Sequence, residues 1–101
     1  MKQTDNRMGS LVISKCGNDK GVYYYVVSEE NGFLYLADGK KKTLEAPKKK
    51  REHHVIYLGR FPEFDIFREN TMILETLARN RVLNKILKKK MKEQQTEEKK
   101  I

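Results

Sequence analysis

The sequence predicts a mainly β domain, a small barrel of about five short strands, followed by C-terminal α-helices. Four or five short β-prone runs, separated by turn signals, fall within about 50 residues. Residues 70–92 then contain neither glycine nor proline and have a composition typical of helix. The chain has 101 residues, which is enough for one domain and leaves little room for a second.

The strand candidates are runs of β-branched and aromatic residues. Residues 11–13 form the first run, and residues 22–27 form the strongest. The remaining candidates are 33–36, 43–46 and 54–58. Asn31-Gly32 lies between two of these runs, and this pair is the strongest short signal for a hairpin. Closing such strands into a barrel removes exposed sheet edges, and some of the rings of Tyr23, Tyr24, Tyr25 and Tyr35 must then point outward.

Two apolar stripes indicate either two helices or a bent one. The apolar residues of 73–78 share one helical face, and those of 82–87 share a face roughly opposite to it. One straight helix cannot bury both stripes against one barrel, so we predict a break around 79–81. The lysines at 88–90 suit a helix C-terminus, where cations oppose the negative end of the dipole. The expected organisation is a flexible tail at 1–7, a barrel at 8–60, a helical extension at 61–92 and a disordered tail at 93–101.

Positive charge is concentrated in one part of the sequence. The formal net charge is +8, from 22 basic and 14 acidic residues. Residues 40–60 alone hold eight basic and two acidic residues, or +6. So tight a cluster repels itself unless a polyanion or solvent screens it, and a nucleic acid provides that screening. A solvated loop kept soluble by lysines is the simpler alternative.

Other classes of function have little support in the residues. The single cysteine, Cys16, excludes an intrachain disulfide and a cysteine-based zinc site. His53 and His54 are neighbours in a predicted strand, so they should point to opposite faces and share no metal. No catalytic set, secretory signal or long apolar run is visible, so we expect no enzyme, cofactor, small-molecule substrate or membrane contact. A reduced, cytoplasmic protein is expected.

Two segments carry a resemblance to a known family. Residues 9–21, GSLVISKCGNDKG, resemble a KOW motif: a strand, a glycine-containing turn with a basic residue, and a second strand. Residues 13–21 and 44–54 are together similar to a KOW subgroup of small bacterial proteins related to the fourteen-e type protein of the large ribosomal subunit. This resemblance covers about residues 8–60. It implies an SH3-like barrel that binds structured RNA, specifically ribosomal RNA on the ribosome.

The expected interface combines a glycine turn with basic loops. Backbone N–H groups of a turn built on Gly17 and Gly21 could approach a phosphate, with the cation of Lys20 beside them. Lysine contacts to phosphates give affinity and register but little sequence information. The candidate RNA-binding residues, expected on one side of the barrel, are Lys15, Gly17, Asn18, Lys20, Gly21, Lys40, Lys41, Lys42, Lys48, Lys49, Lys50, Arg51, His53 and Arg60.

Three alternatives stay open from the sequence. An SH3-like barrel can instead bind proteins, in which case Tyr23, Tyr25 or Tyr35 should line an exposed aromatic groove. A KOW contact to the transcription machinery or to duplex DNA is a weaker option. Residues 47–51 also resemble a nuclear-import signal, a pattern that is common in RNA-binding loops.

Overall fold

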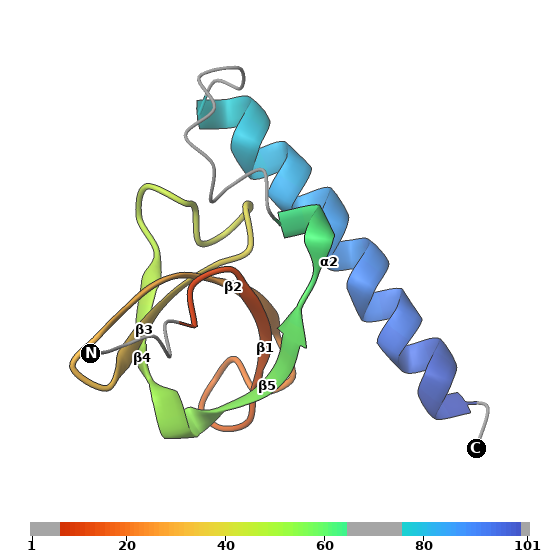
Figure 1. Cartoon of the computed structure of the whole chain (residues 1–101), viewed down its shortest axis with the longest axis horizontal. Helices are drawn as coiled ribbons and strands as arrows, with labels where there is room; N and C mark the ends of the chain where they lie inside the picture. Colours follow the sequence, from red (N-terminus) through yellow and green to blue (C-terminus); the bar gives the residue numbers. More distant parts are fainter. Residues whose placement is uncertain (1–6, 65–75, 100–101) are drawn as a thin grey trace.

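Five antiparallel strands form one curved sheet, and a C-terminal helix packs against it (Figure 1). The computed structural model describes residues 7–64 and 76–99. The sheet order is β4-β3-β2-β1-β5. Within the described residues β4 and β5 remain edges, so the mainly β prediction is confirmed whereas closure into a barrel is not observed. The strands are β1 (Ser10–Ser14), β2 (Tyr23–Glu30), β3 (Phe33–Ala37), β4 (Lys48–Arg51) and β5 (Val55–Arg60).

Local turn chemistry explains the best-predicted connections. Asn31 and Gly32 join β2 to β3 with φ angles of 52° and 82°, so both central residues have the left-handed twist that a two-residue hairpin needs. Gly17 and Gly21 both have φ of 90°, as expected for the turn between β1 and β2. The hairpin and the glycine turn are therefore both confirmed.

The fourth strand lies elsewhere than predicted. Residues 43–46 do not form a strand; β4 is the lysine run Lys48–Arg51, which pairs with β3. The chain turns sharply at 38–42 because the Asp38 carboxylate accepts the backbone N–H groups of Lys40 and Lys42, both at 2.9 Å. Strand formation is thereby delayed until after Pro47. An edge strand tolerates consecutive lysines because charge there discourages pairing with other chains.

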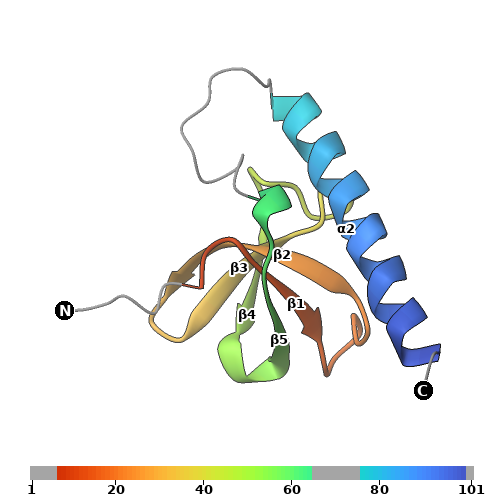
Figure 2. The ribbon, with the colours of Figure 1, turned by 45° about the vertical axis from the view of Figure 1, so that its right-hand side comes forward.

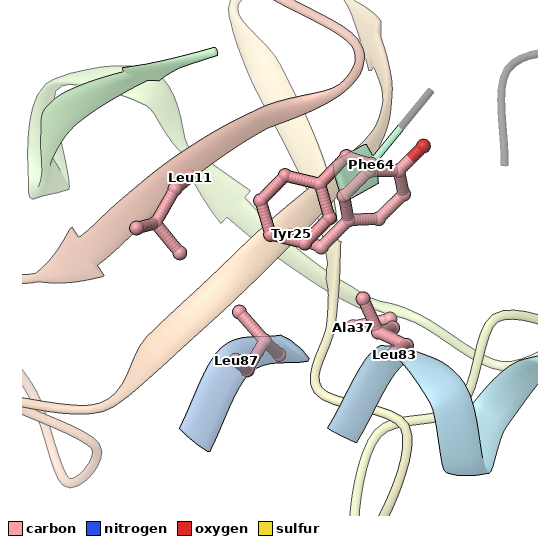
Figure 3. Packing of buried hydrophobic residues seen from close by; sticks show 6 residues of the cluster. All are labelled: Leu11, Tyr25, Ala37, Phe64, Leu83 and Leu87. Atoms are coloured by element: carbon pink, nitrogen blue, oxygen red, sulfur yellow. The ribbon is translucent and has the colours of Figure 1, made fainter. Parts of the chain in front are cut away.

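The sheet buries apolar side chains on both faces. Tyr24 and Tyr25 are successive strand residues, so they point to opposite faces, and each is almost fully buried. Tyr24 packs with Val12, Val26, Leu34, Leu36 and Val55 on the inner side of the curved sheet. Tyr25 belongs to the outer cluster with Leu11, Ala37, Phe64, Leu83 and Leu87 (Figure 3). Two of the four tyrosines considered for outward positions are therefore core residues.

The outer cluster is covered by one continuous helix, α2 (Thr76–Lys99), together with the short 3₁₀ helix η2 (Pro62–Phe64). The predicted break at 79–81 is wrong, because α2 runs through these residues without interruption. Its buried face carries Leu83 and Leu87, as the stripe at 82–87 predicts. The opposing stripe begins at residues 73–75, which lie outside the described residues, as do residues 70–72 of the predicted helical region.

The helix also extends further than expected. It reaches Lys99 rather than ending near residue 92, so Lys88–Lys90 lie in its middle and do not cap its dipole. Lys90 is instead buried, with its Nζ 2.7 Å from a carboxylate oxygen of Glu63 and 4.6 Å from the ring centre of Phe61. Among the described residues no helix combines the length and apolarity needed to cross a membrane.

The start of the described chain is anchored rather than loose. Arg7 lies in the tail predicted at 1–7, yet its guanidinium is 2.7 Å from Glu52 and 3.2 Å from Glu29. The same group stacks over the ring of Tyr57 at 4.6 Å. Residues 1–6 of that predicted tail lie outside the described residues.

Candidate nucleic-acid interface

The carboxylate of Asp19 joins the turn at 15–21 to strand β4. Lys48 Nζ lies 2.8 Å from Asp19 Oδ2, and Lys50 Nζ lies 3.0 Å from Asp19 Oδ1. Lys50 also donates to the carbonyl oxygen of Cys16 at 3.1 Å. Ser14 Oγ and the Tyr24 hydroxyl complete the set, donating to Asp19 at 2.8 and 2.9 Å. Two segments about 30 residues apart are thus fixed to each other by one acidic side chain.

These contacts favour the ionised form of Asp19 and hold the ammonium group of Lys50 inside the structure. Partial burial favours the neutral carboxyl, but hydrogen bonds from Lys48, Lys50, Ser14 and Tyr24 outweigh it and hold the pKa of Asp19 well below its usual range. Burial and the adjacent carboxylate raise the pKa of Tyr24, so its hydroxyl stays a donor. The lysines at 48 and 50 therefore face an acidic neighbour, and the expectation that both reach outward from a loop to phosphates is corrected.

The other half of β4 points to the opposite face of the sheet. Lys49 and Arg51 alternate with the two lysines bound to Asp19, and both are exposed. They flank the ring of Phe33, with Lys49 Nζ at 4.4 Å and the Arg51 guanidinium carbon at 5.0 Å from its centre. Cation–π contact with an aromatic face restrains both groups while leaving their charge in solvent.

The glycine turn uses two of its own backbone N–H groups internally. Lys15, Gly17, Asn18, Lys20 and Gly21 are all exposed. The amides of two of them are already used within the turn, because Lys20 N donates to the Gly17 oxygen at 3.2 Å and Gly21 N to the Ser14 oxygen at 2.8 Å. These two N–H groups are therefore unavailable for the expected phosphate cradle. The cations that the turn offers an anion are the exposed side chains of Lys15 and Lys20.

The two histidines lie beside this turn but not as predicted. They belong to a 3₁₀ turn, η1 (Glu52–His54), and their rings meet edge to face at 4.5 Å rather than pointing to opposite faces. Lys15 N donates to the His54 oxygen at 3.0 Å. Partial burial, His53 and the positive charges of Lys50, Arg51 and Lys15 lower the pKa of His54. Among the described residues, no three potential metal-ligating side chains lie close enough to hold a metal ion.

The pKa of His54 tests whether the positive charges of the turn and of β4 lie close to this histidine. Changing Lys15 to glutamine should raise the pKa of His54, because one of the cations that disfavours its charged form is removed. The measurement is a titration of the imidazole proton signals by NMR, with Lys85→Gln on α2 as a control that leaves the His54 pKa unchanged. An equal pKa in wild type and Lys15→Gln would show that the turn and η1 do not meet in solution.

The loop carrying Lys40, Lys41 and Lys42 is attached to α2 instead. The backbone N–H of Leu44 donates to Asn80 Oδ1 at 2.9 Å, and Asn84 Nδ2 donates to the Asp38 oxygen at 3.0 Å. Asn80 Nδ2 also reaches both carboxylate oxygens of Glu45 at 3.1 Å. The three lysines are exposed beside the first half of the helix, and both views show this loop apart from the turn at 15–21 (Figures 1 and 2). The predicted RNA-binding residues therefore do not all lie on one face of the protein.

The remaining predicted residues and the aromatic alternative are placed as follows. Arg60 is exposed at the end of β5, opposite Ser10 of β1. Tyr25 is packed under α2, and Tyr23 and Tyr35 are half-buried, so Tyr25 cannot line an exposed groove.

No site residue on α2 was predicted from the sequence, yet Arg81, Lys85, Lys88 and Lys92 are all exposed there. Their helical spacing was the signal that could have indicated them.

We name as the turn–β4 surface the exposed cations Lys15 and Lys20 of the turn together with Lys49 and Arg51 of β4. Asp19 joins the two elements through Lys48 and Lys50, which lie on the other face of β4 from Lys49 and Arg51. Counting Lys48 and Lys50 as well, residues 15–21 and 48–51 contain six basic residues and one acidic residue. No family of known proteins matches this chain, and no curated protein matches it. The function is therefore inferred from the residues themselves.

Proposed function

We propose that this chain is a non-enzymatic RNA-binding protein that contacts the phosphates of structured RNA through the turn–β4 surface. The observation that carries the proposal is the junction at Asp19, where two separate basic stretches are fixed to each other with one carboxylate for six cations. Preformed positive charge of this kind lowers the cost of ordering side chains when a polyanion binds.

The resemblance to KOW proteins adds the finer part of the proposal: an SH3-like fold, association with the ribosome and a cytoplasmic location. The strongly curved antiparallel sheet, with neighbouring strands consecutive except at β1 and β5, supports the SH3-like interpretation. Only the three residues of η1 separate the two edge strands in sequence, so the end of β4 and the start of β5 are held near each other. The half-buried or buried tyrosines leave the peptide-binding alternative without a supporting observation.

The salt dependence of RNA binding tests this proposal. Affinity for a hairpin RNA should fall steeply as salt rises, with a log–log slope of several units, because each phosphate contact releases a counterion. The variant Lys15→Gln, Lys20→Gln, Lys49→Gln, Arg51→Gln should reduce the slope by about 3 units, at roughly 0.7 to 0.9 unit per lost contact. These side chains are exposed, so circular dichroism and thermal unfolding should match those of wild type.

Two results would contradict the proposal. An affinity that stays flat between low and moderate salt would remove the electrostatic mechanism altogether. An unchanged slope in the fourfold variant would show that another surface carries the contact.

A further inference from the structure

The outward face of α2 carries a straight line of cations. Arg81, Lys85, Lys88 and Lys92 follow the spacing i, i+4, i+7, i+11, so they project within a narrow sector of the helix and span about 16 Å along its axis. All four are exposed, whereas Leu83 and Leu87, on the opposite side of the same helix, are buried against the sheet. We call these four residues the α2 stripe.

The charge of this stripe is not balanced within the helix. Residues 76–92 contain seven basic residues and no acidic residue, whereas exposed helices usually pair glutamate with lysine three or four positions apart. Glu63, Glu45 and Glu93 are carboxylates that described contacts bring to this part of α2. Buried Lys90 binds both Glu63 and Glu93, and Asn80 binds Glu45. None of these three carboxylates has a described ion pair with the stripe, so an external polyanion is the partner that this surface suits.

A rigid loop enlarges the same surface. Asn80 and Asn84 lie on the flank of α2 next to the stripe, and they hold the loop at 38–45 through the hydrogen bonds described above. Gly39 rests directly against the backbone carbonyl of Asn80. The backbone that carries the exposed Lys40, Lys41 and Lys42 is therefore held beside the helix, so the loop itself need not be ordered when these lysines meet an anion.

The stripe and strand β4 lie on different sides of the molecule. α2 covers the outer cluster over β1 and β2, and the stripe points away from the sheet. Both views place β4 across the sheet from α2 (Figures 1 and 2). One short, straight RNA duplex that lies across β4 therefore does not also run along the stripe.

We propose that the α2 stripe, together with Lys40–Lys42, is a second RNA-backbone contact, through which one molecule bridges two double-stranded RNA segments. The proposal rests on the proposed function, since it takes RNA as the ligand. An acidic protein fits less well, because a stable protein interface needs apolar anchors and the large hydrophobic residue exposed in the described chain is Ile56, on β5. A lipid surface fits less well because the apolar face of α2 is already packed on the sheet.

The experiment uses two short RNA duplexes of one sequence, one labelled with a fluorescence donor and the other with an acceptor. The full chain should bring the labels together, and sedimentation should give one protein and two duplexes per complex. The stripe variant Arg81→Gln, Lys85→Gln, Lys88→Gln, Lys92→Gln should still bind one duplex but lose at least tenfold in energy transfer. Its matched control is the fourfold turn–β4 variant, because each set removes four charges and takes the formal net charge from +8 to +4.

The outcomes separate this inference from the proposed function. A wild-type complex that saturates with one duplex, or a stripe variant that bridges as well as wild type, overturns the bridging proposal and leaves RNA binding at the turn–β4 surface intact. Full affinity in the turn–β4 variant, with loss confined to the stripe variant, overturns the proposed site instead. Stripe-dependent binding to phosphatidylserine vesicles without duplex bridging overturns the choice of RNA, and absence of any duplex binding overturns both proposals.

Discussion

Replacing Asp19 with asparagine is expected to lower the free energy of unfolding by about 2 to 4 kcal/mol. The substitution keeps the shape of the side chain but removes the charge that Lys48 and Lys50 share. Lys50 is largely buried, with 9% of its side chain exposed, so its ammonium would be left in the structure without a counter-charge. Urea unfolding followed by circular dichroism measures the loss.

The neighbouring substitution Asn18→Ala is the control for Asp19→Asn. Asn18 is exposed on the same turn, so its replacement should change stability by no more than about 0.5 kcal/mol. Equal stability of Asp19→Asn and wild type would mean that the Asp19 junction does not hold the turn to β4.

The effect of Asp19 should also depend on pH. Its pKa is lower in the folded protein than the value of about 3.9 expected in the unfolded chain, so folding favours the ionised form. The stabilisation is therefore complete above about pH 5 and is lost as pH falls below about 4. The difference in stability between wild type and Asp19→Asn should shrink in that acidic range, and a difference that grows on acidification would contradict the charge assignment.

Changing Gly39 to alanine is expected to cost at least about 2 kcal/mol, because two penalties add. Gly39 has φ of 80°, which L side chains rarely adopt, and an added Cβ would collide with the backbone carbonyl of Asn80. The loop must then move away from α2, breaking the hydrogen bond from Leu44 N to Asn80 Oδ1. Hydrogen exchange at the Leu44 amide should therefore accelerate, in addition to the loss of stability.

Gly32 provides a matched control for Gly39→Ala. Its φ is 82°, almost the same, but nothing lies within 4 Å of an added Cβ. Gly32→Ala should therefore show the cost of the left-handed backbone alone, about 1 kcal/mol, with no change at Leu44. Equal costs at the two glycines would mean that the loop is not docked on the helix.

The sequence predicts those parts of the fold that depend on near neighbours. The hairpin at Asn31-Gly32 follows from two residues that accept positive φ, and the strand at 22–27 follows from its β-branched and aromatic composition. Strand β4 could not be identified in this way, because a run of lysines has no strand preference and becomes a strand only through pairing with β3. The uninterrupted helix likewise depends on packing of Leu83 and Leu87 across the chain.

The candidate site shows the same division between local and long-range effects. Charge counting drew attention to the basic residues at 15–20 and 48–51, and of these Lys15, Lys20, Lys49 and Arg51 are exposed. It could not show that the carboxylate of Asp19, which lies 29 residues before Lys48, forms ion pairs with both Lys48 and Lys50. Nor could it show that Asn80 and Asn84 draw the loop of Lys40–Lys42 to α2, since these contacts span 36 and 46 residues.

The central claim is that the turn at 15–21 and strand β4 act together as the RNA-binding surface. The most direct measurement is a two-dimensional amide NMR spectrum of the full chain during titration with a short RNA duplex. We predict that the amides of Lys15, Lys20, Lys49 and Arg51 shift together at the first equivalent of RNA. Shifts at that equivalent confined to α2 or to β5, with the turn and β4 unchanged, would contradict the claim.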